Sequence, residues 1–325
     1  MFFAAWLACT STDTTGPSAA GLPQPNGFDD TKESDGNVYV TDSFTHHISP
    51  VDLLMVIDNS CSMAEEQELL DVNGQPFIDF LTLTGSDYHV GVVTTDMDNP
   101  EQAGRLQPTD DGSMWIDPTT YDPFTAFSTL VDQGIEGSGT EMGANAMYTA
   151  IEVLGETANA GFYRPDAMFI GVILSDEHDF TYDYSDLTAD VFVSWLEGLK
   201  PETGLRTFNS IVGPPGGCTY AEDGETYYNI TNLIGGVVAN ICDSTFNGLF
   251  DTMAASIPTT PLPLSETPLE GTIQVVATEP GLDPRSLFVD LEWVHLADTN
   301  QIDIVGALAE GSLIEVTYWP APTTP

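Results

Sequence analysis

Basic residues are scarce in this chain. Its 325 residues include only six Lys and Arg but fifty Asp and Glu, which gives a formal net charge of −44 at pH 7. Such a charge repels phosphate backbones and anionic lipid, so the composition excludes nucleic acid as an expected partner and favours cations instead. The negative charges of the chain repel one another, and dissolved salt weakens this repulsion. The composition therefore fits a solvated acidic surface in a salty environment outside the cell.

Long apolar runs are also missing. After the opening segment MFFAAWLAC, no stretch approaches the ~18 apolar residues that a transmembrane helix needs. This opening ends at Cys9, precedes a stretch rich in Ser, Thr, Gly and Pro, and resembles the start of a bacterial lipoprotein with a lipidated Cys9. We therefore expect a signal or lipoprotein-like segment at 1–9, a flexible acidic linker at 10–36, and membrane attachment only through this anchor. The alternative is an ordinary N-terminus with a chance cysteine.

Cysteines are few. Cys218 and Cys242 lie close in the sequence, and such a pair in an exported protein usually forms a disulfide, which for a loop of this size contributes about 3 kcal/mol. Cys61 would then stay unpaired, although the sequence alone leaves other pairings open. These features favour an exported protein of the bacterial cell envelope, periplasmic or surface-exposed, or a secreted one.

Familiar catalytic motifs are absent as well. The sequence has no HExxH, GxSxG or P-loop, and no Cys/His pair with a plausible partner. We therefore expect a binding protein and not an enzyme.

What the chain does contain is a series of short apolar runs that each end in an acidic residue. VDLLMVID, DYHVGVVTTDM and DAMFIGVILSDEHD are typical of strands buried on both faces, and segments with helical spacing lie between them. This alternation predicts an α/β fold with a mainly parallel central sheet flanked by helices. We assign it to residues 37–257, with an extra strand near residues 38–44.

The pattern changes after Ser256. The Pro-rich segment IPTTPLPLSETP is followed by four strand-like runs separated by turn residues, without helical spacing. A small β module over residues 258–325 is therefore expected.

Oxygen-bearing side chains follow the first buried strand. Asp58, Ser60 and Ser62 form an Asp-x-Ser-x-Ser loop, which directs one carboxylate and two hydroxyls to one side, and hard oxygen ligands of this kind suit Mg²⁺. Asp176 ends a later buried strand, and the carboxyl ends of parallel strands meet at one edge of the sheet. A simpler interpretation of Asp58 and Asp176 is that each caps the helix after its strand.

With Thr140 in GSGTEMGANAM, these residues resemble the metal-ion-dependent adhesion site of the von Willebrand factor type A family, and in particular its exported and lipoprotein members in bacteria. The resemblance covers about residues 51–256 and implies a Rossmann-like fold. It also implies a divalent cation, Mg²⁺ first with Mn²⁺ or Ca²⁺ as alternatives, and a protein partner whose Asp or Glu completes the coordination. The implied ligands are Asp58, Ser60, Ser62, Thr140 and Asp176.

Two positions depart from the family pattern. Glu177 replaces the usual Gly and adds charge near the metal, and Cys61 replaces a smaller residue.

Two other functions stay open. One is a structural envelope protein that the metal only stabilises, and the other is a metal-assisted hydrolase with Glu177 as general base. Asp96 and neighbouring acids could form a second, Ca²⁺-type site or remain solvated, and His178 could be a ligand or a surface residue.

Overall fold

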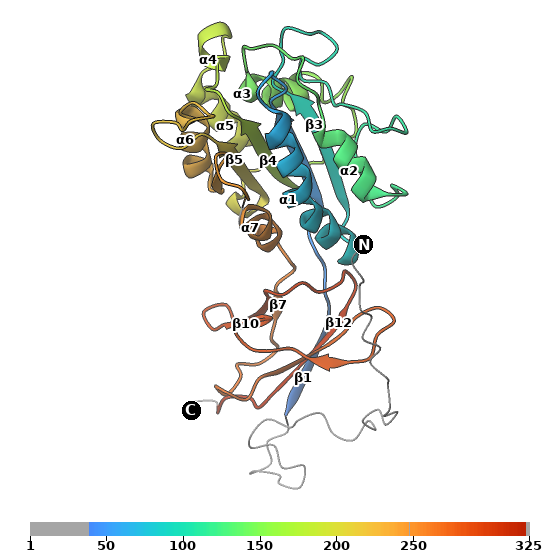
Figure 1. Cartoon of the computed structure of the whole chain (residues 1–325). Coiled ribbons are helices and arrows are strands. Elements are labelled where there is room, and N and C mark those ends of the chain that lie inside the picture. The colour runs from blue at the N-terminus through green and yellow to red at the C-terminus, as the bar shows by residue number, and fades with distance from the viewer. Residues whose placement is uncertain (1–38, 247, 323–325) are drawn as a thin grey trace, which may run out of the picture.

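The computed structural model describes residues 39–246 and 248–322, which form an α/β part and a β part (Figure 1). The expected signal or lipoprotein-like segment 1–9 with Cys9 and the expected linker 10–36 lie outside the described residues. Over the described ranges, no helix has the length and apolar character needed to cross a membrane.

A parallel sheet forms the centre of the α/β part, with strand order β3-β2-β4-β5-β6. Its strands are β2 (Val51–Ile57), β3 (Tyr88–Thr94), β4 (Met168–Ser175), β5 (Arg206–Val212) and β6 (Val238–Asn240). Every residue of β2 and β4 is buried, because helices cover both faces of the sheet. The predicted α/β fold with a mainly parallel sheet is confirmed.

Alternate residues of β2 belong to different cores. Leu53 and Met55 pack with the helices of one face, whereas Leu54 and Val56 pack with those of the other. The first face carries α1 (Ala64–Leu83), α2 (Pro123–Val131) and α7 (Leu249–Ser256). The second carries α3 (Gly143–Tyr148), α5 (Ala189–Leu199) and α6 (Glu225–Ile234). The short helices are α4 (Thr181–Tyr184), η1 (Thr149–Val153) and η2 (Thr203–Leu205).

An ion pair holds the amino-end edge of the sheet. Asp52 on β2 is fully buried, and its carboxylate accepts hydrogen bonds from the backbone N of Arg164 at 2.5 Å and from Arg164 Nε at 2.8 Å. The Arg164 guanidinium also reaches the Asp87 carboxylate, at 2.6 Å. The residues predicted to bind a metal lie at the opposite end of the sheet, after the last residues of β2 and β4.

The β part contains two small antiparallel sheets. One has the order β1-β12-β8-β9 and the other β10-β11-β7. The bounds are β1 (Val40–Thr45), β7 (Leu262–Pro263), β8 (Gln274–Thr278), β9 (Arg285–Ser286), β10 (Trp293–Leu296), β11 (Gln301–Ile304) and β12 (Leu313–Tyr318). Their shared core includes Val275, Trp293 and Tyr318.

Strand β1 corrects one expectation from the sequence. Residues 37–257 were expected to form one unit, but β1 pairs along its whole length with β12, from Val40 opposite Tyr318 to Thr45 opposite Leu313. The alternating half-buried and exposed pattern of β1 suits an edge strand with one face on a core. Periodicity shows that a strand exists, but it does not show which sheet the strand joins.

Two chain segments connect the parts. The segment after β1 and the segment after α7 run antiparallel, with hydrogen bonds from Ser49 N to the Pro258 carbonyl and from Thr260 N to the His47 carbonyl. Glu310 adds a cross-link, because its backbone N donates to the Thr84 carbonyl at the end of α1 and its carboxylate accepts from Ile48 N.

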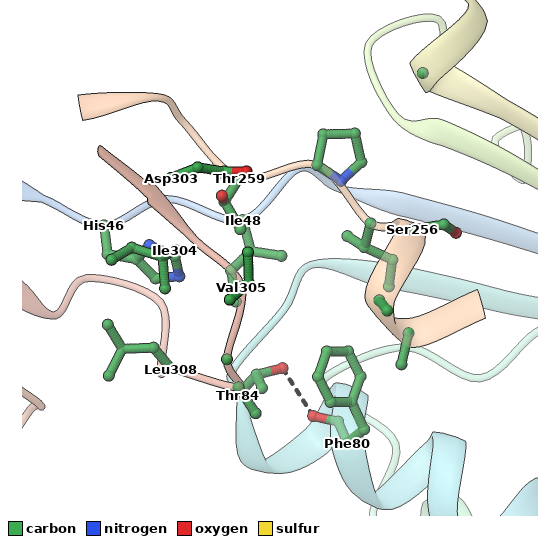
Figure 2. A pocket seen from close by; sticks show the side chains of 17 residues that line it. His46, Ile48, Phe80, Thr84, Ser256, Thr259, Asp303, Ile304, Val305 and Leu308 are labelled. Atoms are coloured by element: carbon green, nitrogen blue, oxygen red, sulfur yellow. Dashed lines mark hydrogen bonds between the residues drawn. The ribbon is translucent and has the colours of Figure 1, made fainter. Parts of the chain in front are cut away.

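A cavity of about 590 Å³ lies at this junction (Figure 2). His46 lines it together with Phe80, Thr84 and residues 303–308 of the β part. The His46 ring is buried, its Nδ1 has no hydrogen-bond partner among the described residues, and burial lowers its pKa.

Candidate metal centre

The Asp58 carboxylate is fixed at the carboxyl end of β2. The backbone N of Asp58 donates to the Leu174 carbonyl of β4 at 2.9 Å, so the loop after β2 is attached to the neighbouring strand. Of the carboxylate oxygens, Oδ1 accepts from Ser60 N at 2.8 Å, and Oδ2 accepts from Ser175 Oγ at 2.7 Å. Asp58 is fully buried, so these bonds hold a preorganised anion beneath the loop.

Two hydroxyls and a second carboxylate lie beside it. Ser60 Oγ and Ser62 Oγ are 3.3 Å apart. Asp176, directly after β4, is only 6% exposed, and its Oδ1 has no hydrogen-bond partner within the described part of the chain. Ser62 lies beside Asp176, and its hydroxyl lowers the pKa of the Asp176 carboxyl. The structure therefore brings together Asp58, Ser60, Ser62 and Asp176, as the sequence predicted for adjacent strand ends.

The two carboxylates are costly to keep charged. Burial raises the pKa of Asp58 to about 6, opposed by hydrogen bonds from Ser175 and Ser60, and the Asp176 charge raises it further. Burial also raises the pKa of Asp176, with the Glu177 charge adding to it. A divalent cation between them would offset this cost, and two carboxylates with two hydroxyls are the hard oxygen donors that Mg²⁺, Mn²⁺ or Ca²⁺ accepts. The residues present therefore fit such an ion.

Thr140 lies on the adjacent loop. That loop is attached to the Asp58 loop by a hydrogen bond from Gly137 N to the Asn59 carbonyl at 2.8 Å, and Thr140 N donates to Ser138 Oγ at 3.1 Å. The Thr140 side chain is half-buried and lines a separate cleft with Met142. In the described residues, its hydroxyl takes no part in the hydrogen bonds that connect the other four predicted ligands.

The sequence reasoning missed Glu141. This residue is fully buried, and neither carboxyl oxygen has a hydrogen-bond partner among the described residues. Burial raises its pKa to about 9, with the Asp58 and Glu177 charges adding to the effect. Its backbone carbonyl accepts from Phe180 N at 2.8 Å, which joins the Thr140 loop to the segment after β4. An acid directly after the predicted Thr ligand was the available signal.

Glu141 completes an unusual concentration of buried acid at this edge. An unpartnered buried carboxyl is unfavourable unless it is protonated or a nearby cation compensates it. Within the described ranges, no group of three or more His, Cys, Asp or Glu side chains is arranged to hold a metal. A cation at this edge would therefore depend on the serine hydroxyls as well as the acids.

The remaining candidates are accounted for by local contacts. Asp96 accepts from the backbone N of Asp98, Asn99 and Ser138, so its carboxylate already organises two loops. His178 Nδ1 lies 2.8 Å from a carboxylate oxygen of Glu222 in an exposed pair. Cys61 is exposed and free.

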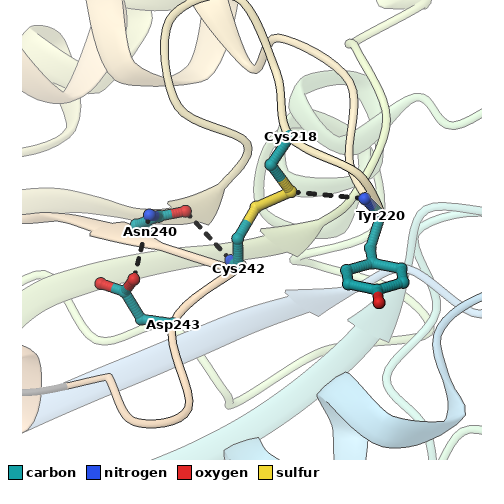
Figure 3. The surroundings of a disulfide bond; sticks show 5 residues. All are labelled: Cys218, Tyr220, Asn240, Cys242 and Asp243. Carbon is teal, nitrogen blue, oxygen red and sulfur yellow. Dashed lines mark hydrogen bonds between the residues drawn. A yellow bond between two sulfur atoms is a disulfide. The ribbon is translucent and has the colours of Figure 1, made fainter.

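The predicted disulfide is present. Cys218 and Cys242 are bonded at 2.06 Å, which joins the segment before α6 to the segment after β6 (Figure 3). The backbone N of Tyr220 donates to Cys218 Sγ at 3.4 Å, and the backbone N of Cys242 donates to Asn240 Oδ1 at 3.0 Å. The bond therefore holds a loop close to the Asp58 edge.

Comparisons with known proteins give matches only in structure. No family model and no curated protein matches this sequence. Among solved structures, a von Willebrand factor type A protein from Catenulispora acidiphila is 14% identical with a TM-score of 0.40, covering 89% of this chain and 66% of that one. The pilus adhesin SpaC from Lactobacillus rhamnosus GG, in its open conformation, is 10% identical with a TM-score of 0.44, covering 88% and 43%.

A third similar structure is proximal thread matrix protein 1 from the mussel byssus with a zinc-occupied MIDAS motif. It is 13% identical with a TM-score of 0.40, covering 66% of this chain and 49% of that one. This chain spans less than two thirds of the length of each of the three. All three likenesses are weak, so any function for this chain depends on its own residues.

Proposed function

We propose that this chain is an exported, metal-dependent protein-binding module of the von Willebrand factor type A kind. A divalent cation, Mg²⁺ in the first place, would be held by Asp58, Ser60, Ser62 and Asp176, with Thr140 supplied by the adjacent loop. A carboxylate of a protein partner would complete the coordination. The observation that carries this proposal is the unpartnered, buried Asp176 Oδ1 beside two serine hydroxyls and a second buried carboxylate.

The protein would contribute to cation binding by fixing the position of a charged carboxylate. Asp58 is oriented by Ser60 N and Ser175 Oγ, so it would bind a cation without reorganising. Mg²⁺ usually keeps several ligand positions for water or substrate, and one of these would be open to a partner. The cation also explains how a chain of charge −44 could bind an acidic group, because it reverses the local sign of the potential.

No catalytic role is part of the proposal. The chain's disulfide agrees with an oxidising, exported location. A lipid anchor at Cys9 stays a prediction from the sequence. A purely stabilising metal is the competing interpretation, and it differs in one respect: it requires no partner.

The test separates cation binding from partner binding. Mn²⁺ affinity is measured by electron paramagnetic resonance for the wild type, Asp58→Ala and Asp190→Ala, the last removing a surface acid on α5 as a matched control. Only Asp58→Ala should lose Mn²⁺. Partners are then captured from the native envelope with Mg²⁺ or with EDTA. Cation binding without any Mg²⁺-dependent partner would favour the stabilising metal, and undiminished Mn²⁺ binding by Asp58→Ala would overturn the site.

A further inference from the structure

A pocket of about 550 Å³ opens beside the metal loop. We call it the Tyr220 pocket; the residues that matter here are Ser62, Glu65, Glu66, Tyr220, Cys242 and Asp243. Ser62 belongs both to this pocket and to the cluster around Asp176, so the pocket and the candidate metal centre are continuous. A partner that reaches the cation would therefore also lie over this pocket.

Acidic side chains surround the pocket. Glu65 and Glu66 stand in the first turn of α1, and Asp243 follows β6 on the other side. Oε2 of Glu66 is buried and has no hydrogen-bond partner among the described residues, and the Asp176 charge raises the Glu66 pKa in addition to the effect of burial. The negative potential thus extends from the metal centre into the pocket, and it is not cancelled by a basic residue lining it.

An aromatic ring completes the pocket. Tyr220 is 78% exposed, although it lies in a loop that the disulfide holds in place (Figure 3). Its backbone N donates to Cys218 Sγ, and Cys218 N donates to the Ala221 carbonyl at 2.8 Å. Asp243 is oriented by Asn240 Nδ2 at 3.1 Å. The ring is exposed on a loop whose backbone is already held in place, so a partner would have to order only the Tyr220 side chain.

Acids around an aromatic ring are chemically suited to a Lys or Arg side chain. The carboxylates attract the charged head, and the ring can accept a cation on its face. The net charge of the chain points the same way, because −44 attracts basic groups of a partner and repels acidic ones that no cation compensates.

We propose that the Tyr220 pocket binds a basic side chain of the partner whose carboxylate reaches the cation. The recognised surface then presents an acidic and a basic side chain close together. This inference rests on the proposed function, because Ser62 links the pocket to the cation. It adds the requirement that the partner also carries a basic side chain, which the cation alone does not demand.

The probe is a random peptide library displayed on phage. It is selected on the full chain in Mg²⁺, after depletion of clones that bind in EDTA. Wild-type selections should be enriched in Asp or Glu and also in Lys or Arg. Selections on the double variant Tyr220→Ala/Asp243→Asn should keep the acidic enrichment and return Lys and Arg to the library level.

Synthetic versions of the selected peptides give the magnitude. Tyr220→Ala and Asp243→Asn should each weaken binding about two- to fivefold, as expected for one cation–π contact or one partly exposed ion pair. Tyr220→Phe, which keeps the ring, and Asp298→Asn, which removes an exposed acid of the β part, should change it less than twofold.

The outcomes distinguish the two levels of the proposal. Acidic enrichment without basic enrichment would overturn the pocket and leave the cation-dependent function intact. A selection that yields no Mg²⁺-dependent peptide overturns both. Mn²⁺ affinity of the double variant within twofold of wild type ensures that a loss of Lys and Arg reports on the pocket and not on the metal centre.

Discussion

Replacing Asp58 by Asn should change the stability of the protein in opposite directions with and without a divalent cation. Without a cation, the variant removes a fully buried negative charge next to Asp176. The Asn side chain can still accept from Ser60 N through Oδ1, and its amide can donate to Ser175 Oγ. The variant therefore keeps the loop's hydrogen bonds and loses only the charge.

The magnitude follows from the protonation equilibrium. Burial raises the pKa of Asp58 from 3.8 to about 6, so its charged form costs the folded state about 3 kcal/mol at pH 7. In EDTA, Asp58→Asn should accordingly be more stable than the wild type by about 1–3 kcal/mol, allowing for an imperfect Asn fit. At a Mg²⁺ concentration 1,000 times Kd, the wild type gains about 4.1 kcal/mol, which exceeds this difference, and the variant gains nothing.

Urea unfolding at pH 7, in EDTA and in Mg²⁺, measures both differences. The order of stability should reverse between the two conditions, with Asp190→Asn following the wild type in each. If Asp58→Asn is destabilised equally in EDTA and in Mg²⁺, Asp58 acts as a loop cap and the metal site is refuted.

Three further perturbations test the same structure. The pKa values of Asp58 and Asp179 are both raised by burial to about 6, and a carboxyl with a raised folded pKa contributes stability below its unfolded pKa that is lost as pH rises. In EDTA, Tm should therefore fall between about pH 4 and pH 6.5, whereas a rising Tm over that range would contradict the burial of these acids. Arg164→Met should cost about 3–5 kcal/mol in urea unfolding because it removes the guanidinium that pairs with the fully buried Asp52, and adding Asp52→Asn should restore part of it. Cys218→Ser should cost about 3 kcal/mol, equal to the effect of dithiothreitol on the wild type, and an unchanged urea midpoint would argue against the bond.

The apolar pattern determined the central sheet. Runs such as VDLLMVID could be identified because both faces of β2 and β4 are covered by helices, which leaves almost no polar position in the strand. Asp58 and Asp176 could then be placed together, since parallel strands end at one edge. The cysteine spacing, together with the expectation of export, was enough to predict the pair Cys218–Cys242.

Other features depended on contacts between distant segments. Strand β1 carries an ordinary edge-strand pattern, and only its pairing with β12, some 270 residues later, assigned it to the β part. Glu141 looks like one acid among fifty, and its importance comes from complete burial beside Asp58. Tyr220 likewise acquires meaning only where the disulfide and the first turn of α1 form one pocket with it.

The sequence by itself determined the elements and their order, because hydrophobic periodicity and turn residues are local properties. It also indicated which oxygen-bearing side chains follow the strands. Tertiary structure decided which of these side chains are removed from water, and burial is what changes a carboxylate from a solvated surface group into an anion that needs a cation. That difference separates Asp58, Asp176 and Glu141 from the exposed acids of this chain.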